Sequence, residues 1–303
     1  MSCDHEWLYF CIYPGSHHFS YLDDIVREIV EPSINLFPAG CVEKWFFLRY
    51  WDAGGLHIRV RYLVQKDTSF YLRRWMEDNG KAILNDLIKN KPTPLQSYTT
   101  PPLYLCEKKT VIEQHKYIPE FDKYGGDLGV MLAESVFYES SKLVMELLHK
   151  ISAENASRTH AGIYLMLKSV QTIITGCKEQ NLFLTEYFHQ FTRSQTTDPA
   201  IIRNTIDESV ARHVSVIQDQ WEGIISHTFL HTLTIDYIQA LQDAVNQLRL
   251  LNASLQTTGV LLHYIHTTNN RLGVSMHEES FIAKLILKIL GSRSQNDEAK
   301  GSI

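Results

Sequence analysis

The chain has 303 residues, 44% of them hydrophobic, which is enough to bury a sizeable core as a globular protein. A formal net charge of −5 gives no general attraction to nucleic acid, and neither a signal peptide nor a run of about 18 apolar residues is found. The five cysteines are scattered without a CxxC spacing, so a disulfide framework and a zinc knuckle are disfavoured and a reducing cytoplasm is expected.

The first half of the chain contains most of the strand signals. Aromatic and branched residues predict a strand over residues 6–13, which ends at Pro14-Gly15. The stretch 45–62 predicts two strands on either side of Gly54-Gly55, and residues 103–118 predict a further strand of the same sheet.

Helical spacing begins early and dominates the second half. In the first half it covers residues 22–30, where Pro32 is expected to end the helix, and 69–89, with a break near Asn79-Gly80. In the second half, apolar residues recur with a 3.6-residue period over 127–151, 159–178, 199–218, 230–256, 258–268 and 277–290.

These patterns predict an α+β fold, with a mostly antiparallel sheet in the N-terminal half packed with a helical bundle in the C-terminal half. No internal repeat or linker separates the halves, so residues 1–290 are expected to form a single domain. Residues 291–303 have almost nothing to bury and are expected to be a disordered tail.

The segment His57-Ile58-Arg59-Val60-Arg61 has the first arrangement of chemical interest. Alternation along a strand places His57, Arg59 and Arg61 on one face. Arginines are rarely buried unless paired, so this face is expected to meet solvent, acidic partners or an anionic ligand. The spacing alone does not separate an anion site from an ordinary solvated face.

Two further segments draw attention, and two others are explained without a functional site. Gly125-Gly126 precede a long helix, which fits a tight turn, and they form no phosphate-binding motif. In "VLLHYIHTTNNRLGV" two histidines crowd with polar residues in one short segment, which favours a functional site over a purely structural one. His227 and His231 have metal-ligand spacing but no third ligand, and "MHEESF" reads as a helix start with acidic residues in its first turn.

In order along the chain, "EWLYFCIY", "WFFLRYWDAGGLHIRVRY", "YIPEFDKYGG…MLAESVFYESS" and "HTTNNRLG" resemble the C-terminal domain of lantibiotic dehydratases. The same domain is found as separate thiopeptide-type bacteriocin biosynthesis proteins. The resemblance extends roughly from Trp7 to Leu290, and its specificity lies in the ordered set of stretches. It implies a lyase that eliminates glutamate from glutamylated Ser or Thr of a ribosomal precursor peptide, leaving dehydroalanine or dehydrobutyrine.

The resemblance also implies roles for particular residues. Arg59 and Arg61 would grip the glutamyl group, and His266 would transfer the proton, which makes these three the catalytic candidates. The substrate-binding candidates come from the same matching stretches and are His57, Arg49, Lys123, Tyr124, Asn270 and Arg271. Asn270 and Arg271 would orient His266 or the peptide.

The implied partners are the glutamylated precursor peptide and a separate protein that adds glutamate from glutamyl-tRNA, with no direct contact to nucleic acid here. No cofactor and no metal are expected, and a homodimer is left open. One departure is Lys123, where the family usually has arginine before Tyr-Gly-Gly, so the planar fork that grips a carboxylate is lost. Two alternatives remain: a formal [4+2] cycloaddition, as in thiopeptide pyridine synthases, and a non-catalytic module that binds the precursor peptide.

Overall fold

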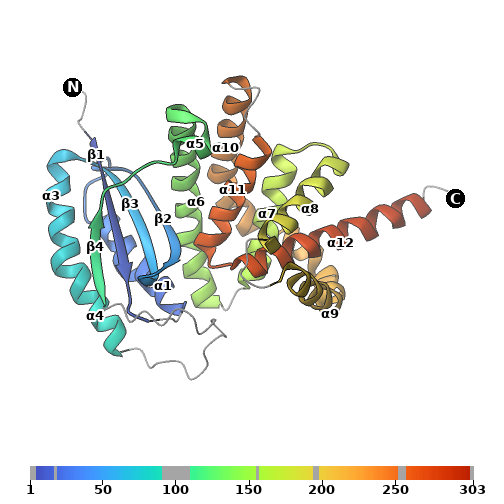
Figure 1. The fold of residues 1–303 in the computed structure, drawn as a ribbon, viewed down its shortest axis with the longest axis horizontal. Helices are drawn as coiled ribbons and strands as arrows, with labels where there is room; N and C mark the ends of the chain where they lie inside the picture. The colour runs from blue at the N-terminus through green and yellow to red at the C-terminus, as the bar shows by residue number, and fades with distance from the viewer. Residues whose placement is uncertain are drawn as a thin grey trace. The chain divides into compact units, whose positions relative to one another are not determined.

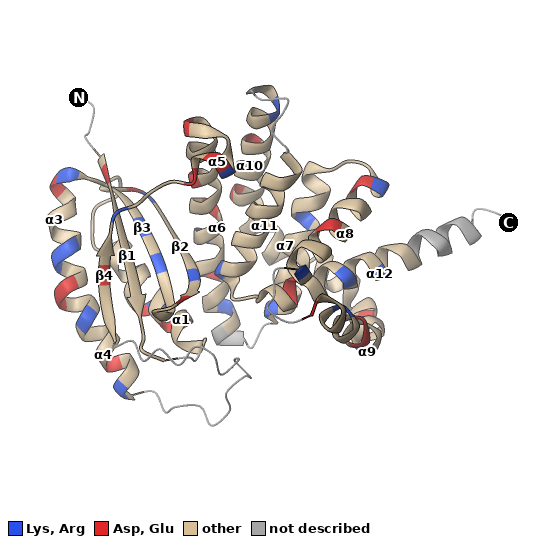
Figure 2. Cartoon of the chain, viewed as in Figure 1, with Lys and Arg blue, Asp and Glu red and all other residues tan. Residues whose placement is uncertain are grey.

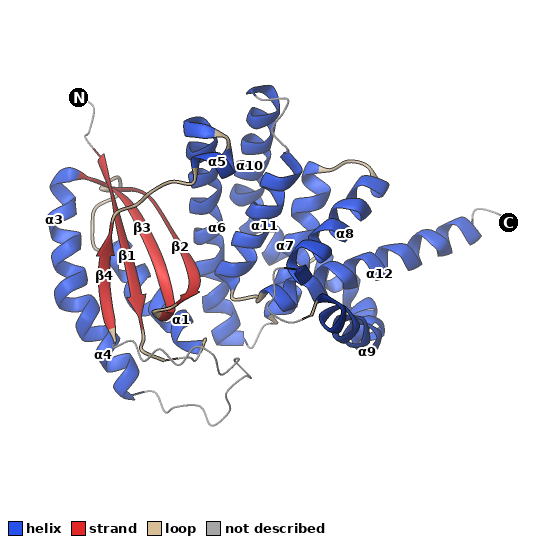
Figure 3. Cartoon of the chain, viewed as in Figure 1, coloured by secondary structure: helices blue, strands red, loops and turns tan. Residues whose placement is uncertain are grey.

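The structure is a computed structural model that describes residues 5–16, 19–90, 110–154, 157–193, 198–251 and 257–300 (Figure 1). The chain forms two compact units. Unit 1 contains residues 1–122 and 126–153, and unit 2 contains residues 123–125 and 154–303. The expected α+β class is confirmed, with the strands in the first half and most helices in the second (Figure 3). The single-domain prediction for residues 1–290 stays a prediction.

Unit 1 is built on a four-stranded antiparallel sheet. Its strands are β1 (His5–Tyr13), β2 (Val42–Asp52), β3 (Gly55–Gln65) and β4 (Val111–His115), in the order β2-β3-β1-β4. The predicted hairpin between β2 and β3 turns at Asp52, whose Oδ1 accepts the Gly54 N–H at 2.7 Å, and Gly55 follows at φ 95°. β3 therefore lies in the interior of the sheet between β2 and β1. Of the strand predicted within 103–118, residues 103–109 lie outside the described part.

Two continuous helices, each with a π-helical turn in its middle, cover one face of this sheet, and we call them the helical arms. The first consists of α1 (Ser20–Ile25), the π-helical turn η1 (Val26–Val30) and α2 (Glu31–Asn35). The second consists of α3 (Lys66–Trp75), the π-helical turn η2 (Met76–Gly80) and α4 (Lys81–Asn90). The β3 side chains on this face are fully buried, namely Ile58, Val60, Tyr62 and Val64.

Both predicted helix breaks are wrong, and each has a physical reason. The first helix continues past Pro32 because a wider π-helical turn directly precedes it and accommodates the missing N–H. The second continues through Gly80, where a Cβ would lie 3.1 Å from Cδ1 of Ile112 on β4. Gly80 thus allows close packing of the helix against the sheet instead of ending the helix.

The long helix α6 (Gly126–Glu154) runs along the edge strand β2 within unit 1 (Figure 1). The Phe47 N–H on that edge donates to Oγ of Ser141 at 3.3 Å, and Phe46 packs on Phe137 with ring centroids 5.4 Å apart. α6 therefore covers an edge that would otherwise expose unpaired backbone donors. The short helix α5 (Phe121–Tyr124) precedes it, and Gly125 and Gly126 both have a φ of 87° as the predicted turn requires.

Unit 2 is a bundle of helices. They are α7 (Arg158–Ile173), α8 (Cys177–Arg193), α9 (Pro199–Ile225), α10 (Thr228–Leu251), α11 (Thr257–Leu272) and α12 (Met276–Lys300). α7 is buried over every residue from Ala161 to Leu167, and a Cβ at Gly162 would lie only 2.9 Å from Cδ1 of Ile282, so α7 and α12 pack closely there. α8 was not predicted from the sequence.

The last helix, α12, extends to the end of the described part of the chain. α12 continues to Lys300, and residues 301–303 lie outside the described part, so the disordered tail stays a prediction. Within the described ranges, none of the helices combines the length and the apolar character needed to cross a membrane.

Candidate functional site

The sheet face opposite the two helical arms carries the predicted arginines of β3. Arg61 lies opposite Tyr9 of β1 and Phe46 of β2, and Arg59 lies opposite Cys11 and Leu48. Figure 2 shows basic segments on these strands. The predicted shared face of His57, Arg59 and Arg61 agrees with the register, but the three side chains have different surroundings.

Arg61 lies in a cage of three aromatic rings. Its guanidinium carbon is 4.4 Å from the ring centroid of Tyr9, 5.1 Å from that of Tyr117 and 5.3 Å from that of Phe46. The Nε and Nη1 atoms are buried, and neither has a hydrogen-bond partner among the described residues. Burial lowers the pKa of Arg61, but from a value so high that the side chain stays cationic. A caged guanidinium with two unused donors is suited to bind a planar anion such as a carboxylate.

The Tyr117 ring of this cage is hydrogen-bonded to a buried carboxyl group. The Tyr117 hydroxyl donates to Oε1 of Glu134 on α6 at 2.9 Å, and Glu134 is only 8% exposed. Burial raises the pKa of Glu134, while the Tyr117 hydrogen bond and the charges of Lys44 and Arg61 oppose that rise. Tyr117 is thereby held in place beside the Arg61 guanidinium.

Arg59 is already engaged on several sides. Its Nη2 donates to Oδ2 of Asp52 at 3.3 Å, its Nε donates to Nε2 of His57 at 3.1 Å, and its guanidinium carbon lies 3.3 Å from the Tyr50 ring centroid. The side chain is 24% exposed, and that of Asp52 is 36% exposed. Arg59 therefore meets a carboxylate of its own strand pair before any ligand arrives.

His57 is fully buried, and its imidazole accepts a hydrogen bond from Arg59 on the same face of β3. Nε2 accepts from Arg59, so the ring proton is on Nδ1, which donates to the Gly55 carbonyl at 2.9 Å. The Tyr13 ring lies against the imidazole with centroids 4.3 Å apart. The geometry is that of a support for Arg59, and the substrate-binding role of His57 stays a prediction.

Arg49 lies on the opposite face of the sheet from Arg59 and Arg61, because it is paired with Ile58 across the β2–β3 ladder. It is 5% exposed, and its Nη2 is 2.7 Å from Oδ1 of Asp23 on α1. The structure therefore does not bring Arg49 together with the arginine face, and its contact with Asp23 ties β2 to the helical arm.

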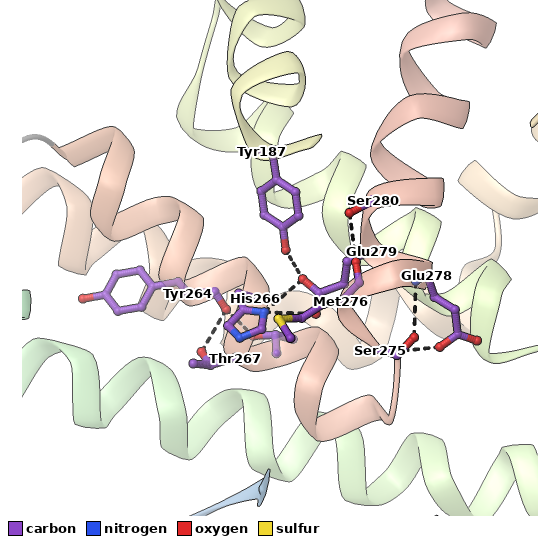
Figure 4. A network of polar contacts seen from close by, with 10 residues as sticks. Tyr187, Tyr264, His266, Thr267, Ser275, Met276, Glu278, Glu279 and Ser280 are labelled. Atoms are coloured by element: carbon purple, nitrogen blue, oxygen red, sulfur yellow. Dashed lines mark hydrogen bonds and ion pairs between the residues drawn. The ribbon is translucent and has the colours of Figure 1, made fainter. Parts of the chain in front are cut away.

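The predicted histidine of unit 2 forms a pair with a glutamate that the sequence analysis did not single out. Nδ1 of His266 on α11 lies 3.0 Å from Oε1 of Glu279 on α12 (Figure 4). The His266 side chain is 26% exposed, whereas Glu279 is fully buried. Since a carboxylate only accepts, His266 donates from Nδ1 and Nε2 keeps its lone pair. We call this arrangement the His266–Glu279 pair.

Two residues of α8 contact the His266–Glu279 pair. The Tyr187 hydroxyl donates to Oε2 of Glu279 (Figure 4). The Phe191 ring stacks on the His266 imidazole with centroids 4.6 Å apart. Burial raises the pKa of Glu279, and the hydrogen bonds from His266 and Tyr187 oppose that rise. Burial, together with the charge of Glu279, raises the pKa of Tyr187 well above its ordinary value, so the hydroxyl keeps its proton and remains a donor.

The segment "MHEESF" was expected to be a helix start with acidic residues in its first turn. Glu278 has this role, whereas Glu279 is buried. Glu278 and Ser275 form a reciprocal capping box at the start of α12, with distances of 2.7 and 3.3 Å (Figure 4). Glu279, one residue later, points into the bundle. The signal that identifies it is helical spacing, because it shares the apolar stripe of Ile282, Ala283 and Ile286, all fully buried.

The remaining predicted residues lie in unit 2. Tyr124 stacks on Tyr264 of α11, with ring centroids 6.1 Å apart and an angle of 8° between the rings, and Lys123 Nζ lies 5.4 Å from the Tyr124 ring centroid. Tyr264 is two residues before His266, so the Tyr-Gly-Gly stretch and the histidine segment are brought together. Arg271 is fully buried, and the Asn270 carbonyl accepts the Gly273 N–H at 3.0 Å. The contact at His266 Nδ1 comes from Glu279, and the orienting roles of Asn270 and Arg271 stay predictions.

Comparison with known proteins places this arrangement in a family. Residues 7–290 match the family described as lantibiotic biosynthesis dehydratase C-term. The fold is shared with the pyridine synthase TbtD from thiomuracin biosynthesis, with a TM-score of 0.66, 14% identity and coverage of 93% of this chain and 97% of that one. No curated protein sequence matches the chain.

Two further solved structures share the fold. The tRNA-dependent lantibiotic dehydratase MibB from Microbispora sp. 107891 has a TM-score of 0.62 and 17% identity over 96% of this chain, which spans only 28% of that chain. TsrL has a TM-score of 0.61 and 14% identity, covering 96% of this chain and 95% of that one. At these identities the structures show the fold alone. By the family match over nearly its whole length, the chain belongs to the lantibiotic biosynthesis dehydratase C-terminal family, whose members act in the biosynthesis of modified ribosomal peptides.

Proposed function

We propose that this protein is a lyase that eliminates glutamate from glutamylated Ser or Thr of a ribosomally made precursor peptide. The observation that carries the proposal is the caged guanidinium of Arg61, with two buried donors that no described residue uses. An unused buried donor costs about 1–3 kcal/mol, and an anionic ligand would satisfy it. A glutamyl group brings a carboxylate, and the reaction releases a second one.

The elimination divides into two requirements. A base removes the Cα proton of the esterified residue, the electron pair forms the Cα–Cβ double bond, and the Cβ–O bond breaks so that glutamate leaves as a carboxylate. The first requirement is thus a positioned base, and the second is a cationic group that stabilises the departing carboxylate. Unit 2 contains a residue for the first requirement and unit 1 contains residues for the second.

His266 meets the chemical needs of the base. Its Nδ1–H is directed to Glu279, so Nε2 is unprotonated in the neutral ring and accessible through a side chain that is 26% exposed. After taking the Cα proton the imidazolium is stabilised by the buried carboxylate. Proton transfer by a positioned side chain contributes about 10²–10⁴-fold to a rate.

Arg61 meets the needs of the anion receptor, and Arg59 assists it from the same face. Because Arg59 already holds Asp52 at 3.3 Å, we assign the main carboxylate contact to Arg61. The glutamyl group would be added beforehand by a separate protein that uses glutamyl-tRNA, and both would act in the cytoplasm on the same precursor peptide.

A second candidate is the formal [4+2] cycloaddition of two dehydroalanines. The observation in its favour is that the chain covers 97% of the pyridine synthase TbtD but only 28% of MibB. That reaction joins two neutral alkenes and uses no carboxylate receptor, so it leaves the Arg61 cage unexplained.

One mass-spectrometric experiment separates the two candidates. The purified protein is incubated in parallel with a peptide that bears one glutamyl-Ser ester and with a peptide that bears two dehydroalanines. Loss of glutamate from the first peptide supports elimination. An unchanged ester, together with loss of the leader segment from the second peptide, would replace elimination by cycloaddition. Binding of either peptide without any turnover would favour a non-catalytic module.

A further inference from the structure

We infer that Glu279 is a positioning residue that fixes the tautomer and ring orientation of His266, with Tyr187 holding the Glu279 carboxylate in place. The inference rests on the proposed role of His266 as the base, and it adds residues from α8 and α12 to that role. It stands on the contacts between His266, Glu279 and Tyr187 within unit 2 (Figure 4).

The two oxygens of the Glu279 carboxylate are held by two donor side chains. Nδ1 of His266 lies 3.0 Å from Oε1 and 3.1 Å from Oε2, and Oε2 also accepts from the Tyr187 hydroxyl. The carboxylate is fully buried, so the two donor side chains compensate for the loss of water around its charge. A group held by both donors cannot rotate without breaking a buried hydrogen bond, and it therefore presents the same edge of the carboxylate to His266 in one geometry.

The tautomer and the orientation of the His266 imidazole follow from its contacts. The Nδ1 contact decides the tautomer because a carboxylate can only accept, so the ring proton is on Nδ1 and the lone pair on Nε2. Phe191 stacks on one side of the ring at 4.6 Å and limits its rotation. The charged groups that act on Glu279 are His266 and the neighbouring Glu278, and the other titratable contact is Tyr187. Glu278 caps α12 through Ser275, whereas Glu279 lies 3.0 Å from His266 Nδ1, so Glu279 is the carboxylate that acts on the imidazole.

An amide at position 279 would change the donors and acceptors that face His266. In a Glu279→Gln variant one position carries an oxygen and the other an NH₂ group. If the oxygen accepts from Tyr187, the NH₂ group faces Nδ1 and shifts the ring proton to Nε2, which removes the free lone pair. A Tyr187→Phe substitution in the same chain removes the competing donor, so the oxygen can return to His266.

The test follows the tautomer of His266 by ¹⁵N nuclear magnetic resonance on the full chain. A His266→Gln variant assigns the His266 signals among the 14 histidines. The expected result is a protonated Nδ1 and a bare Nε2 in the wild type, a shift toward protonated Nε2 in Glu279→Gln, and partial return of the wild-type tautomer in the double variant. Glu278→Gln is the matched control and should leave the His266 signals unchanged. An Nε2-protonated ring in the wild type, or unchanged signals in Glu279→Gln, would overturn the inference.

A kinetic arm separates this inference from the proposed function. With the glutamyl-Ser peptide, Glu279→Gln should lower kcat by roughly tenfold or more with little change in KM, since the loss concerns the proton-transfer step. If the resonance signals behave as expected but no variant and no wild-type sample eliminates glutamate, the positioning role stands and the proposed reaction fails. If elimination proceeds at the wild-type rate in Glu279→Gln with a shifted tautomer, the positioning role has no part in the chemistry and the inference is wrong.

Discussion

Arg59 donates a hydrogen bond from Nη2 to Oδ2 of Asp52 at 3.3 Å, so the first arginine of the β3 pair already holds a carboxylate, whereas the buried Nε and Nη1 of Arg61 meet no acceptor in the described part of the chain. This difference predicts unequal roles for two residues with the same spacing and the same face. Arg61→Lys should weaken binding of the glutamyl peptide by about 10- to 100-fold, because lysine keeps the charge but loses the fork. Arg59→Lys should weaken it less.

The measurement is the KM of each variant for the glutamyl-Ser peptide, with thermal unfolding as a check of folding. Arg73→Lys is the matched control, since Arg73 pairs with Glu6 at 2.9 Å on the same sheet unit and is not part of the cage. Equal losses in the two β3 variants, or a larger loss in Arg59→Lys, would contradict the assignment.

Asp52 should act as an internal competitor for Arg59. Asp52→Asn keeps the Oδ1 acceptor for the Gly54 N–H but removes the charge beside Arg59, so the guanidinium becomes more available to a substrate carboxylate. We expect KM for the glutamyl peptide to fall by roughly two- to fivefold, the range of an exposed ion pair. Asp24→Asn, which removes the separate pair with Arg27, is the control. A rise in KM for Asp52→Asn would show that Asp52 positions Arg59 instead of competing for it.

Glu134 should make stability depend on pH. Burial raises its pKa in the folded state, so between its unfolded and folded pKa values the folded protein binds more protons than the unfolded chain. The stabilisation is complete below the unfolded value and is lost as pH rises through the folded value. Glu134→Gln keeps an acceptor for Tyr117 and removes this loss.

The comparison is made by urea unfolding of the wild type and Glu134→Gln at pH 5 and at pH 8. The variant should gain stability relative to the wild type on going from the lower to the higher pH. A difference that is constant with pH, or that changes in the other direction, would count against a raised pKa for Glu134.

Lys123 stands where the resemblance described above implies an arginine. Lys123→Arg restores the planar fork, and we expect kcat/KM for the glutamyl peptide to rise several-fold. The matched control is Lys142→Arg, since Lys142 also lies near a tyrosine ring, 5.2 Å from the centroid of Tyr138. A lower kcat/KM for Lys123→Arg would indicate that this chain is adapted to lysine at the site, and therefore to a different substrate geometry.

Strand alternation predicted the arginine face correctly, because a period of two is a local property of residues 57–61. It could not tell which arginine keeps buried donors that no described residue uses, since that depends on Asp52 across the hairpin turn and on the Tyr9 and Tyr117 rings from distant segments. The face occupied by Arg49 was equally hidden, because it depends on the pairing of Arg49 with Ile58 across the β2–β3 ladder, and the partner of Arg49, Asp23, comes from a separate helix.

The histidine segment was found from its crowding of polar residues, but its partner was not. Glu279 looks like an ordinary acidic residue in a first helical turn, although its spacing from Ile282 and Ile286 indicates the buried side of that helix. That it contacts His266 depends on the packing of α11 against α12, which the spacing does not reveal. Pro32 and Gly80 misled the helix predictions for the same reason, since tertiary packing and π-helical turns decided both positions.

The central claim is best tested with a peptide that carries one glutamyl-Ser ester and deuterium at the Cα of that serine, incubated with the purified protein alone. The account predicts release of free glutamate with formation of dehydroalanine, a slower reaction than with hydrogen at Cα, and no reaction with His266→Ala. Recovery of the intact ester, or of serine formed by simple hydrolysis with the deuterium retained, would contradict it.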